Sequence, residues 1–254
     1  MENNDEKSED RRLGFFNNND DKNYIGDERI RPYLSYKKEN SYCIYCSNIA
    51  DSREHLPPRV FIDTPNKNEW NIVPACKTCN NGYSEDEQLV ACAIEYILAM
   101  VYYDGEIQRD KVKNTFKKRP RMLEKIQLLC KIEGGNLVID NTIIESIKNV
   151  FFKIGQGHFM YDCSTFLDDN ATISIAFEPQ LTQKELDEFN SPIICNCLPE
   201  IGSRASSQIC LNINANEMVI LWNIIDDKNY RYLISNDGIL RIVVREFLYI
   251  EIIQ

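Results

Sequence analysis

The sequence lacks any run of about 18 consecutive apolar residues, the length at which an apolar stretch indicates a helix that crosses a lipid bilayer. The first residues, MENNDEKSEDRR, also lack the basic and apolar regions of a secretory signal peptide. We therefore expect a soluble, cytoplasmic protein that has no membrane partner. Glycine and proline are sparse, at 10 and 9 of 254 residues, and 43% of the residues are hydrophobic, so a collagen-like or wholly disordered chain is excluded.

Positive charge is also scarce, because 29 Lys and Arg residues face 39 Asp and Glu residues and give a net charge of −10. This balance argues against a protein that binds nucleic acid over its whole surface, and it leaves room for a local basic site. One stretch concentrates seven basic residues, and its central part supplies our candidate DNA-binding residues. An exposed, solvated helix face is the alternative interpretation. The seven are Lys111, Lys113, Lys117, Lys118, Arg119, Arg121 and Lys125, with Lys117, Lys118, Arg119 and Arg121 as the candidates.

Three segments follow from the composition along the chain. Residues 1–38 form an acidic, Asn-rich leader without hydrophobic periodicity, which we expect to be poorly ordered. Residues 39–105 form the second segment: its part over 41–81 holds four cysteines and few long apolar runs, as expected of a small module held together by metal, and a helical stripe follows. Residues 106–254 are expected to be helical at first and rich in β-strands later, and their role is not predicted. The fold class is α+β.

Individual elements can be predicted from periodicity and from the residues that bound it. A helix over 84–103 has Ser84 as its N-cap and Glu87 three residues later, the pattern of a capping box. A second helical stretch over 110–133 is interrupted near Pro120. After residue 170, short β-branched and aromatic runs separated by turn residues predict an antiparallel sheet. A further helix is expected over 143–154, bounded by Gly155 and Gly157.

The strongest local signal is a pair of Cys-x-x-Cys motifs, Cys43–Cys46 and Cys76–Cys79. A cytoplasmic protein keeps its thiols reduced, so clustered cysteines point to a metal instead of disulfides. Four thiolates from two tight turns suit the tetrahedral coordination of Zn²⁺. Such a site leaves no open position, so this zinc would be structural. The alternative is that the four cysteines are ordinary buried residues.

Further residues between and after these pairs complete a recognisable pattern. Glu54-His55-Leu56-Pro57-Pro58 lies between them, and Asn71 begins the stretch Asn-Ile-Val-Pro-Ala that leads into the second pair. Asn80 follows the last cysteine directly. In order, spacing and residue type, this stretch resembles the HNH endonuclease family in its variant with a four-cysteine zinc knuckle. The resemblance covers roughly residues 41 to 90.

The resemblance implies a ββα-metal fold in which two strands and a helix hold a catalytic Mg²⁺ or Mn²⁺ beside the scissile phosphate. By position, His55 would be the general base, Glu54 and Asn80 the ligands of that cation, and Asn71 a brace for the loop. The chemistry is consistent with this, because His titrates near neutral pH and hard cations prefer oxygen ligands. Adjacent residues of a strand point to opposite faces, so Glu54 and His55 share a site only if the backbone bends near Pro57.

The resemblance therefore implies an endonuclease that hydrolyses phosphodiester bonds of DNA, with RNA as a second substrate class. Its family acts in bacterial restriction and phage defence, among other systems. The low positive charge favours an enzyme that is activated by a partner protein or ligand. The alternative function is a noncatalytic zinc-knuckle module that binds nucleic acid or a protein. His158, the other histidine, is expected to have a structural role. Oligomeric state is not predicted.

Overall fold

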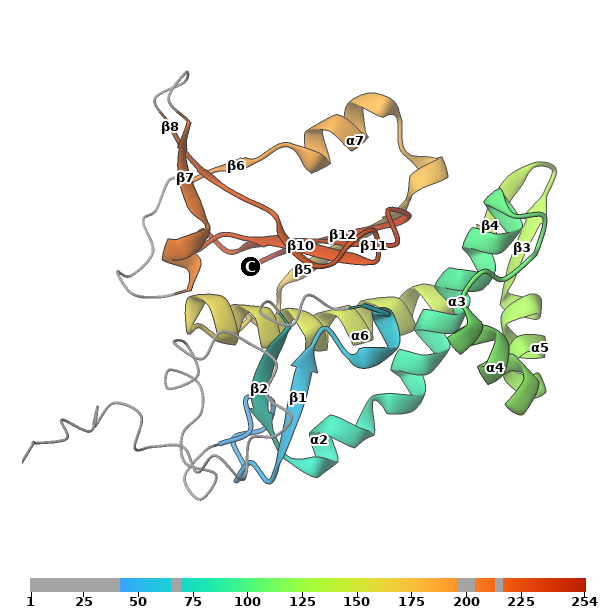
Figure 1. Ribbon diagram of the computed structural model, residues 1–254, viewed down its shortest axis with the longest axis horizontal. Helices are drawn as coiled ribbons and strands as arrows, with labels where there is room; N and C mark the ends of the chain where they lie inside the picture. Colours follow the sequence, from blue (N-terminus) through green and yellow to red (C-terminus); the bar gives the residue numbers. More distant parts are fainter. Residues whose placement is uncertain (1–41, 65–69, 196–203, 213–216) are drawn as a thin grey trace, which may run out of the picture.

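The computed structural model describes residues 42–64, 70–195, 204–212 and 217–254. The leader expected over 1–38 lies outside the described residues. A long central helix, α6 (Asn141–His158), separates a β-hairpin with its helix on one side from a five-stranded sheet on the other (Figure 1). The helices α3, α4 and α5 gather at one end of α6. Within the described residues, no helix is both long enough and apolar enough to cross a membrane.

The segment with the four cysteines folds as a hairpin followed by a short helix. Strand β1 (Ser52–Leu56) pairs antiparallel with β2 (Asn71–Ala75), with Ser52 opposite Ala75 and Leu56 opposite Asn71. Helix α2 (Lys77–Gly82) begins directly after β2. The pairing continues through all five residues of each strand, so β1 runs straight through Glu54 and His55. The bend that would bring these two side chains together is not present.

The connection between the two strands is fixed to the sheet of the C-terminal region. It contains the one-turn helix η2 (Arg59–Phe61), and the backbone N–H groups of Asp63 and Thr64 both donate to Asp226 Oδ2, at 2.6 and 2.9 Å. Arg109 donates to the Asp63 carboxylate from the other side, at 2.7 Å from Nη2 to Oδ1. These contacts hold the chain that leaves β1 in one position.

Two of the predicted helical stretches match the structure closely. Helix α3 spans Ser84–Tyr102, and the second stretch divides into α4 (Asp110–Lys118) and α5 (Pro120–Leu129), with Pro120 at the start of α5. The predicted capping role of Ser84 is wrong, because Tyr83 is the N-cap and the Ser84 hydroxyl donates to Asn81 O instead. The end of the second stretch is also wrong: residues 130–139 form a hairpin of β3 (Cys130–Glu133) and β4 (Asn136–Ile139).

Helix α6 runs through both glycines that were expected to end it. It begins after Asp140, whose side chain accepts a hydrogen bond from Thr142 N, and it leads into the π-helical turn η3 (Phe159–Cys163). A Cβ at Gly155 would lie 2.8 Å from Ile252 Cδ1, and one at Gly157 would lie within 2.9 Å of Leu56 Cδ1. These glycines therefore serve close packing against the sheet and the hairpin, and they do not terminate the helix.

The predicted antiparallel sheet is confirmed and has the order β5-β12-β11-β10-β9. The continuous β-branched and aromatic stretch over 240–253 divides into two strands, since Arg245 and Glu246 adopt positive φ and turn the chain. Turns at 227–229 and 236–238 join the other neighbours, as the Asp, Asn and Gly residues there indicate. The strands are β5 (Thr172–Phe177), β9 (Asn223–Asp226), β10 (Tyr230–Ile234), β11 (Ile239–Val244) and β12 (Leu248–Ile253).

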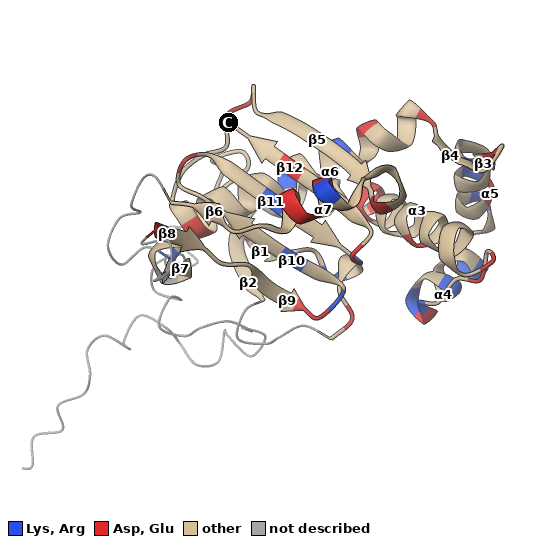
Figure 2. Ribbon diagram, turned by 90° about the horizontal axis from the view of Figure 1, so that it is seen from above, with Lys and Arg blue, Asp and Glu red and all other residues tan. Residues whose placement is uncertain are grey.

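Helix α7 (Gln183–Asn190) covers the face of this sheet opposite α6 (Figure 2). Thr182 and Glu185 form its capping box, a signal that was present in the sequence although no helix was predicted here. Arg241 on β11 donates to Phe189 O at 3.0 Å, and a cavity of about 270 Å³ remains beside it. The other elements are η4 (Glu178–Gln180), η5 (Ala205–Gln208) and a small sheet of β6 (Ile193–Ile194), β7 (Ile209–Asn212) and β8 (Glu217–Ile220).

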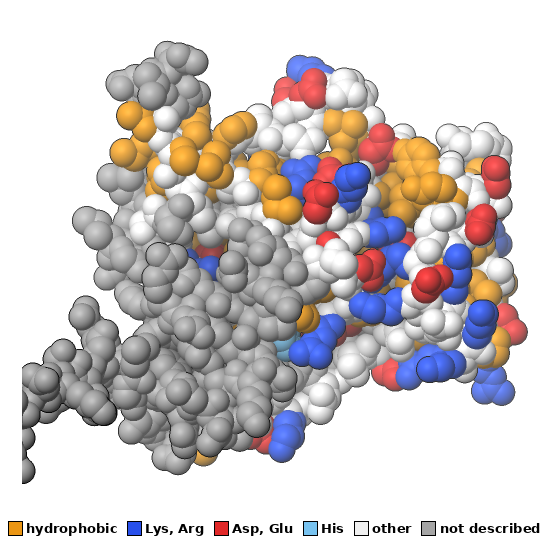
Figure 3. Space-filling model, in the orientation of Figure 1, with side chains coloured by type: hydrophobic (Ala, Val, Ile, Leu, Met, Phe, Trp, Pro, Cys, Tyr) orange, Lys and Arg blue, Asp and Glu red, His pale blue; other side chains and the backbone are white. Residues whose placement is uncertain are grey.

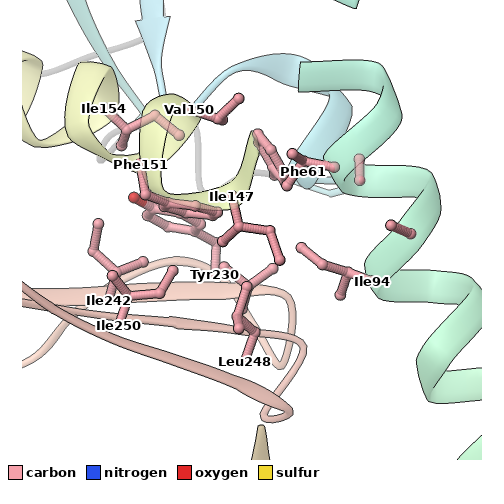
Figure 4. Packing of buried hydrophobic residues seen from close by; sticks show 14 of the residues in the cluster. Phe61, Ile94, Ile147, Val150, Phe151, Ile154, Tyr230, Ile242, Leu248 and Ile250 are labelled. Atoms are coloured by element: carbon pink, nitrogen blue, oxygen red, sulfur yellow. The ribbon is translucent and has the colours of Figure 1, made fainter. Parts of the chain in front are cut away.

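One continuous hydrophobic core joins the elements from both sides of α6. Phe61 from η2 contacts Phe151 on α6, with ring centroids 5.4 Å apart, while Ile94 approaches from α3 (Figure 4). Ile147 and Phe151 point from α6 toward Tyr230 and the sheet. The core thus includes residues on both sides of the boundary expected between residues 105 and 106. The predicted α+β class with a C-terminal antiparallel sheet is confirmed.

Candidate functional site

The four cysteines of the two Cys-x-x-Cys motifs come together beside the hairpin. Cys43 and Cys46 lie in a tight turn in which Ser47 N donates to Cys43 O and Cys43 N donates to Asn48 O. Cys76 is the N-cap of α2, and Cys79 lies in the first turn of that helix, where its N–H donates to the Cys76 sulfur. Each motif therefore presents its two sulfurs from a turn that the backbone fixes.

The distances between the sulfurs suit a tetrahedral metal site. All four lie within 4.8 Å of one another, and the Sγ atoms of Cys46 and Cys76 are 3.7 Å apart. Sulfurs that are each 2.3 Å from a central Zn²⁺ are separated by about 3.8 Å in a regular tetrahedron. The four cysteines could thus hold a metal ion such as zinc, and their clustering is not what ordinary, unrelated buried cysteines would show.

The thiols of this cluster differ in acidity. The backbone N–H of Asn48 lowers the pKa of Cys46 to about 7, while burial raises the pKa of Cys43 and of Cys79. The other three thiols add to the rise at Cys79. Four negatively charged thiolates this close together repel one another when no cation lies between them. A bound divalent cation reverses this effect, because a coordinated thiol loses its proton.

His55 lies on the face of β1 that points away from the core, beside an aromatic ring and a cation. Its ring centroid is 4.2 Å from that of Trp70, and Arg59 Nη2 lies 3.3 Å from His55 Nε2. A guanidinium group can only donate, so Nε2 accepts and the imidazole proton lies on Nδ1. Burial and, to a smaller extent, the Arg59 charge lower the pKa of His55 to about 4. His55 is therefore neutral at pH 7.

We expect an NMR titration of His55 to have its midpoint near pH 4, and Arg59→Gln should raise it while leaving it below the ordinary value of 6.5. Burial, the larger cause, persists in that variant. Since the folded state binds fewer protons than the unfolded state between pH 4 and 6.5, the contribution of His55 to stability is present above pH 6.5 and is lost as the pH falls toward 4. A midpoint at or above 6.5 in the wild type would contradict this environment.

Glu54 points to the opposite face of β1 and is buried, with 4% of its surface exposed. Its Oε1 accepts from the Lys153 ammonium group on α6 at 2.5 Å, and the same group donates to Glu87 Oε1 on α3 at 3.0 Å. Burial raises the pKa of Glu54 to about 7, and the Lys153 ammonium opposes this rise. Burial lowers the pKa of Lys153, but the carboxylates of Glu54 and Glu87 together outweigh burial and raise it. Glu54 thus has a fixed cationic partner within the protein.

The two asparagines of the predicted site make separate structural contacts. Asn71 is buried and donates from Nδ2 to the hydroxyl of Tyr232, at 3.2 Å. Asn80 donates from Nδ2 to Ser52 Oγ at 2.7 Å and to Arg53 O at 2.9 Å, so it braces the start of β1 against α2. The role expected for Asn71 as a brace of the loop stays a prediction, and its observed partner belongs to the distant strand β10. Glu54, His55 and Asn80 do not surround one common point.

The basic stretch begins near His55 and leads away from it. Lys111 at the start of α4 donates to Arg59 O at 3.2 Å and to Ile62 O at 2.8 Å. The four candidate DNA-binding residues are exposed at the other end of α4 and the start of α5, and Arg119 pairs with Glu85 at 2.5 Å. Basic and acidic side chains alternate over this side of the molecule (Figure 3). The stretch is a mixed surface in which Lys111 is nearest to His55.

A buried polar cluster at the end of α6 was not recognised from the sequence as a unit. His158 has 0% of its surface exposed, and its Nε2 lies 3.0 Å from the Tyr230 hydroxyl. Asp162 Oδ1 accepts from the Tyr232 hydroxyl at 3.2 Å and from Gln208 Nε2 at 3.0 Å. The full burial of His158 agrees with the structural role expected for it. The i, i+4 spacing of His158 and Asp162 was the available signal.

The comparisons with known proteins leave these residues as the sole basis for a functional assignment. Comparison of the chain with protein-family models, with curated proteins and with solved structures gave no match.

Proposed function

We propose that this protein is an HNH-like endonuclease that hydrolyses phosphodiester bonds of DNA, with His55 as the general base. The observation that carries the proposal is the position of His55 on a straight hairpin strand, with Arg59 at its Nε2 and a four-cysteine metal site at the start of the following helix. This order of two strands and a helix is the one that the resemblance implies. The cytoplasm, where thiols stay reduced, suits the four cysteine ligands.

The imidazole lone pair of His55 and the positive charges beside it support a hydrolytic role. The neutral imidazole has a lone pair on Nε2, which can accept a proton from water as the water attacks phosphorus. The Arg59 guanidinium and the Lys111 ammonium supply positive charge that a phosphate group would meet at this edge. A phosphate that draws Arg59 away from Nε2 would raise the pKa of His55 toward neutrality, which is where a general base works best.

The two proposed metal ions differ in how well the residues fit them. Cys43, Cys46, Cys76 and Cys79 fit a structural Zn²⁺, which would close the turn before β1 onto α2 and supply folding energy without taking part in hydrolysis. Glu54 and Asn80 together do not fit a catalytic Mg²⁺ or Mn²⁺, because Glu54 is buried against Lys153 on the face of β1 opposite His55.

The resemblance supplies the substrate class, DNA with RNA as the second candidate, and the charge of the protein indicates how tightly a nucleic acid would bind. With a net charge of −10, the protein repels nucleic acid over most of its surface, so we expect weak and strongly salt-dependent binding of DNA or RNA. This favours an enzyme whose activity depends on a partner protein or ligand, as in a defence or restriction system.

A noncatalytic binding module is the second candidate, and specific contacts favour it. Glu54, Asn71 and Asn80 all make intramolecular contacts that a purely structural module would need. In that case the exposed surface around Arg59 and Lys111 would bind a nucleic acid without cutting it.

The test is cleavage of supercoiled plasmid and of RNA by zinc-loaded protein, with Mg²⁺, with Mn²⁺ and with EDTA. We expect His55→Ala to lower the cleavage rate by about 10²–10⁴-fold, the usual contribution of a general base. Zinc content should stay unchanged, because His55 lies outside the four-cysteine cluster, and cooperative thermal unfolding will show that the variant remains folded although its contact with Trp70 is lost. Lys184→Gln on α7 is the matched control, since that side chain is 84% exposed and belongs to the opposite side of the sheet.

Cleavage by His55→Ala at the wild-type rate would remove His55 from the mechanism. If the wild type binds labelled DNA but cuts neither DNA nor RNA under any of these conditions, the binding module becomes the better assignment.

A further inference from the structure

We infer that the cation bound by Glu54 is the ammonium group of Lys153, which occupies the position between Glu54 and Glu87 that a divalent metal ion would otherwise take. Three elements meet there: β1 supplies Glu54, α3 supplies Glu87 and α6 supplies Lys153. The inference does not depend on the proposed nuclease activity, because it concerns which cation these carboxylates hold.

The distances and the burial make this a closed site. Lys153 Nζ lies 2.5 Å from Glu54 Oε1 and 3.0 Å from Glu87 Oε1, and 2% of the Lys153 surface is exposed. Charge-assisted hydrogen bonds of this kind are the strong ones, and removing one partner of a buried pair leaves an uncompensated buried charge. These two contacts therefore stabilise the ammonium group in this position.

Aromatic rings complete the surroundings of the ammonium group. Lys153 Nζ lies 4.8 Å from the ring centroid of Tyr83 and 5.4 Å from that of Tyr45. Both distances are within the range of a cation–π interaction. Tyr45 lies between Cys43 and Cys46, and Tyr83 follows α2, so the cysteine-bearing unit itself provides these rings. The site thus combines two carboxylates and two π-faces, which suits an ammonium ion.

A divalent ion would not fit beside the ammonium group. Mg²⁺ lies about 2.1 Å from carboxylate oxygens, demands octahedral geometry and keeps several of its waters. With Lys153 Nζ at 2.5 Å from Glu54 Oε1, an ion at that oxygen would meet a positive charge at nearly contact distance. Glu54 is also too deeply buried to leave room for a cation that keeps part of its hydration shell. Two carboxylates without the ammonium group would, in contrast, offer hard oxygen ligands to a cation.

Glu54 is accordingly a positioning residue. It ties β1 to α3 and α6, and it thereby fixes the strand on which the next residue, His55, faces outward. Lys153 belongs to the C-terminal region, so this buried ion pair is one of the contacts, beside Asn71–Tyr232, through which that region holds the hairpin of His55 in place.

The test is Mn²⁺ binding to zinc-loaded protein, followed by electron paramagnetic resonance. We expect wild type and Glu54→Gln to bind Mn²⁺ equally, and Lys153→Met to gain one further Mn²⁺ per chain that Lys153→Met/Glu54→Gln loses. Lys148→Met is the matched control, because it removes the same charge from the same helix at an exposed position and should gain no site. A wild-type Mn²⁺ site that Glu54→Gln abolishes would overturn the inference, and so would a Lys153→Met protein that gains no site.

A measurement on the unchanged protein keeps the inference testable if Lys153→Met does not fold. In ¹⁵N-labelled wild type, the Lys153 ammonium protons should exchange slowly with water and should show through-bond correlations to the carboxylate carbons of Glu54 and Glu87. An ammonium signal that exchanges as fast as those of exposed lysines would overturn the inference. Neither measurement requires cleavage activity. A protein without nuclease activity could therefore still confirm or contradict the inference about Lys153.

Discussion

Cys76→Ser is expected to abolish binding of the structural metal and to lower the free energy of unfolding by several kcal/mol. Cys76 is both a candidate ligand and the N-cap of α2, and its sulfur accepts from Cys79 N. A structural Zn²⁺ contributes about 10–16 kcal/mol of binding free energy in small zinc-dependent folds, and whole domains are stable by only about 5–15 kcal/mol. Losing one ligand should therefore unfold the segment over 42–82 first.

The measurement is zinc content by native mass spectrometry, together with thermal unfolding with and without EDTA. Cys210→Ser is the matched control, because Cys210 is exposed on β7 and lies outside the four-cysteine cluster. We expect the control to keep one zinc per chain and the wild-type melting temperature, and EDTA should bring wild type close to Cys76→Ser. If Cys76→Ser retained zinc as tightly as wild type, the four sulfurs would not be the ligand set.

Gly157→Ala is expected to destabilise the protein by about 1–3 kcal/mol, the usual cost of inserting a methyl group into a packed core. Leu56 on β1 is fully buried and lies directly against Gly157, within 2.9 Å of the position of the new methyl group. Chemical denaturation will measure the change. The added methyl group must displace the Leu56 side chain, and where β1 moves with it we also expect the Lys153–Glu54 contact to loosen and the ammonium exchange to become faster.

A graded series of glycine variants separates this packing effect from helix propensity. Gly155→Ala meets the terminal methyl group of Ile252, a flexible side-chain end, and should cost less than Gly157→Ala. A Cβ at Gly82 has no neighbour within 4 Å, so Gly82→Ala should be neutral or slightly stabilising. If all three substitutions had the same effect, close packing of Leu56 against α6 would not be the cause.

The sequence predicted those features whose determinants lie close together in the chain. Two Cys-x-x-Cys motifs predict a sulfur cluster because each motif is one turn, and the apolar stripe of α3 reflects its own periodicity. The two glycines of α6 were misinterpreted because the side chains that they accommodate, Leu56 and Ile252, are about a hundred residues away in sequence. The same holds for Glu54, whose partner Lys153 is 99 residues distant. Local pattern identifies a candidate residue, but only the tertiary fold supplies its neighbour.

The prediction that Ser84 is the N-cap of α3 was wrong for a different physical reason. The chain enters α3 directly from α2 with Tyr83 already in a helical conformation, and the Glu87 N–H group that a Ser84 cap would bind donates to Tyr83 O at 2.8 Å. A capping-box pattern predicts a helix start only where the preceding residue is extended, as it is at Thr182 before α7.

The inner side of the β1–β2 hairpin has consequences for the transfer of this unit between proteins. Glu54, Leu56 and Asn71 face Lys153, Gly157 and Tyr232, and all three of these partners lie beyond residue 105. In an excised fragment that ended there, the Glu54 carboxylate and the Asn71 amide would lose these hydrogen-bond partners, and Leu56 would be exposed to solvent. We therefore expect that the metal-binding unit does not fold independently, and that any fusion protein or recombinant that keeps it must also contain α6 and β10.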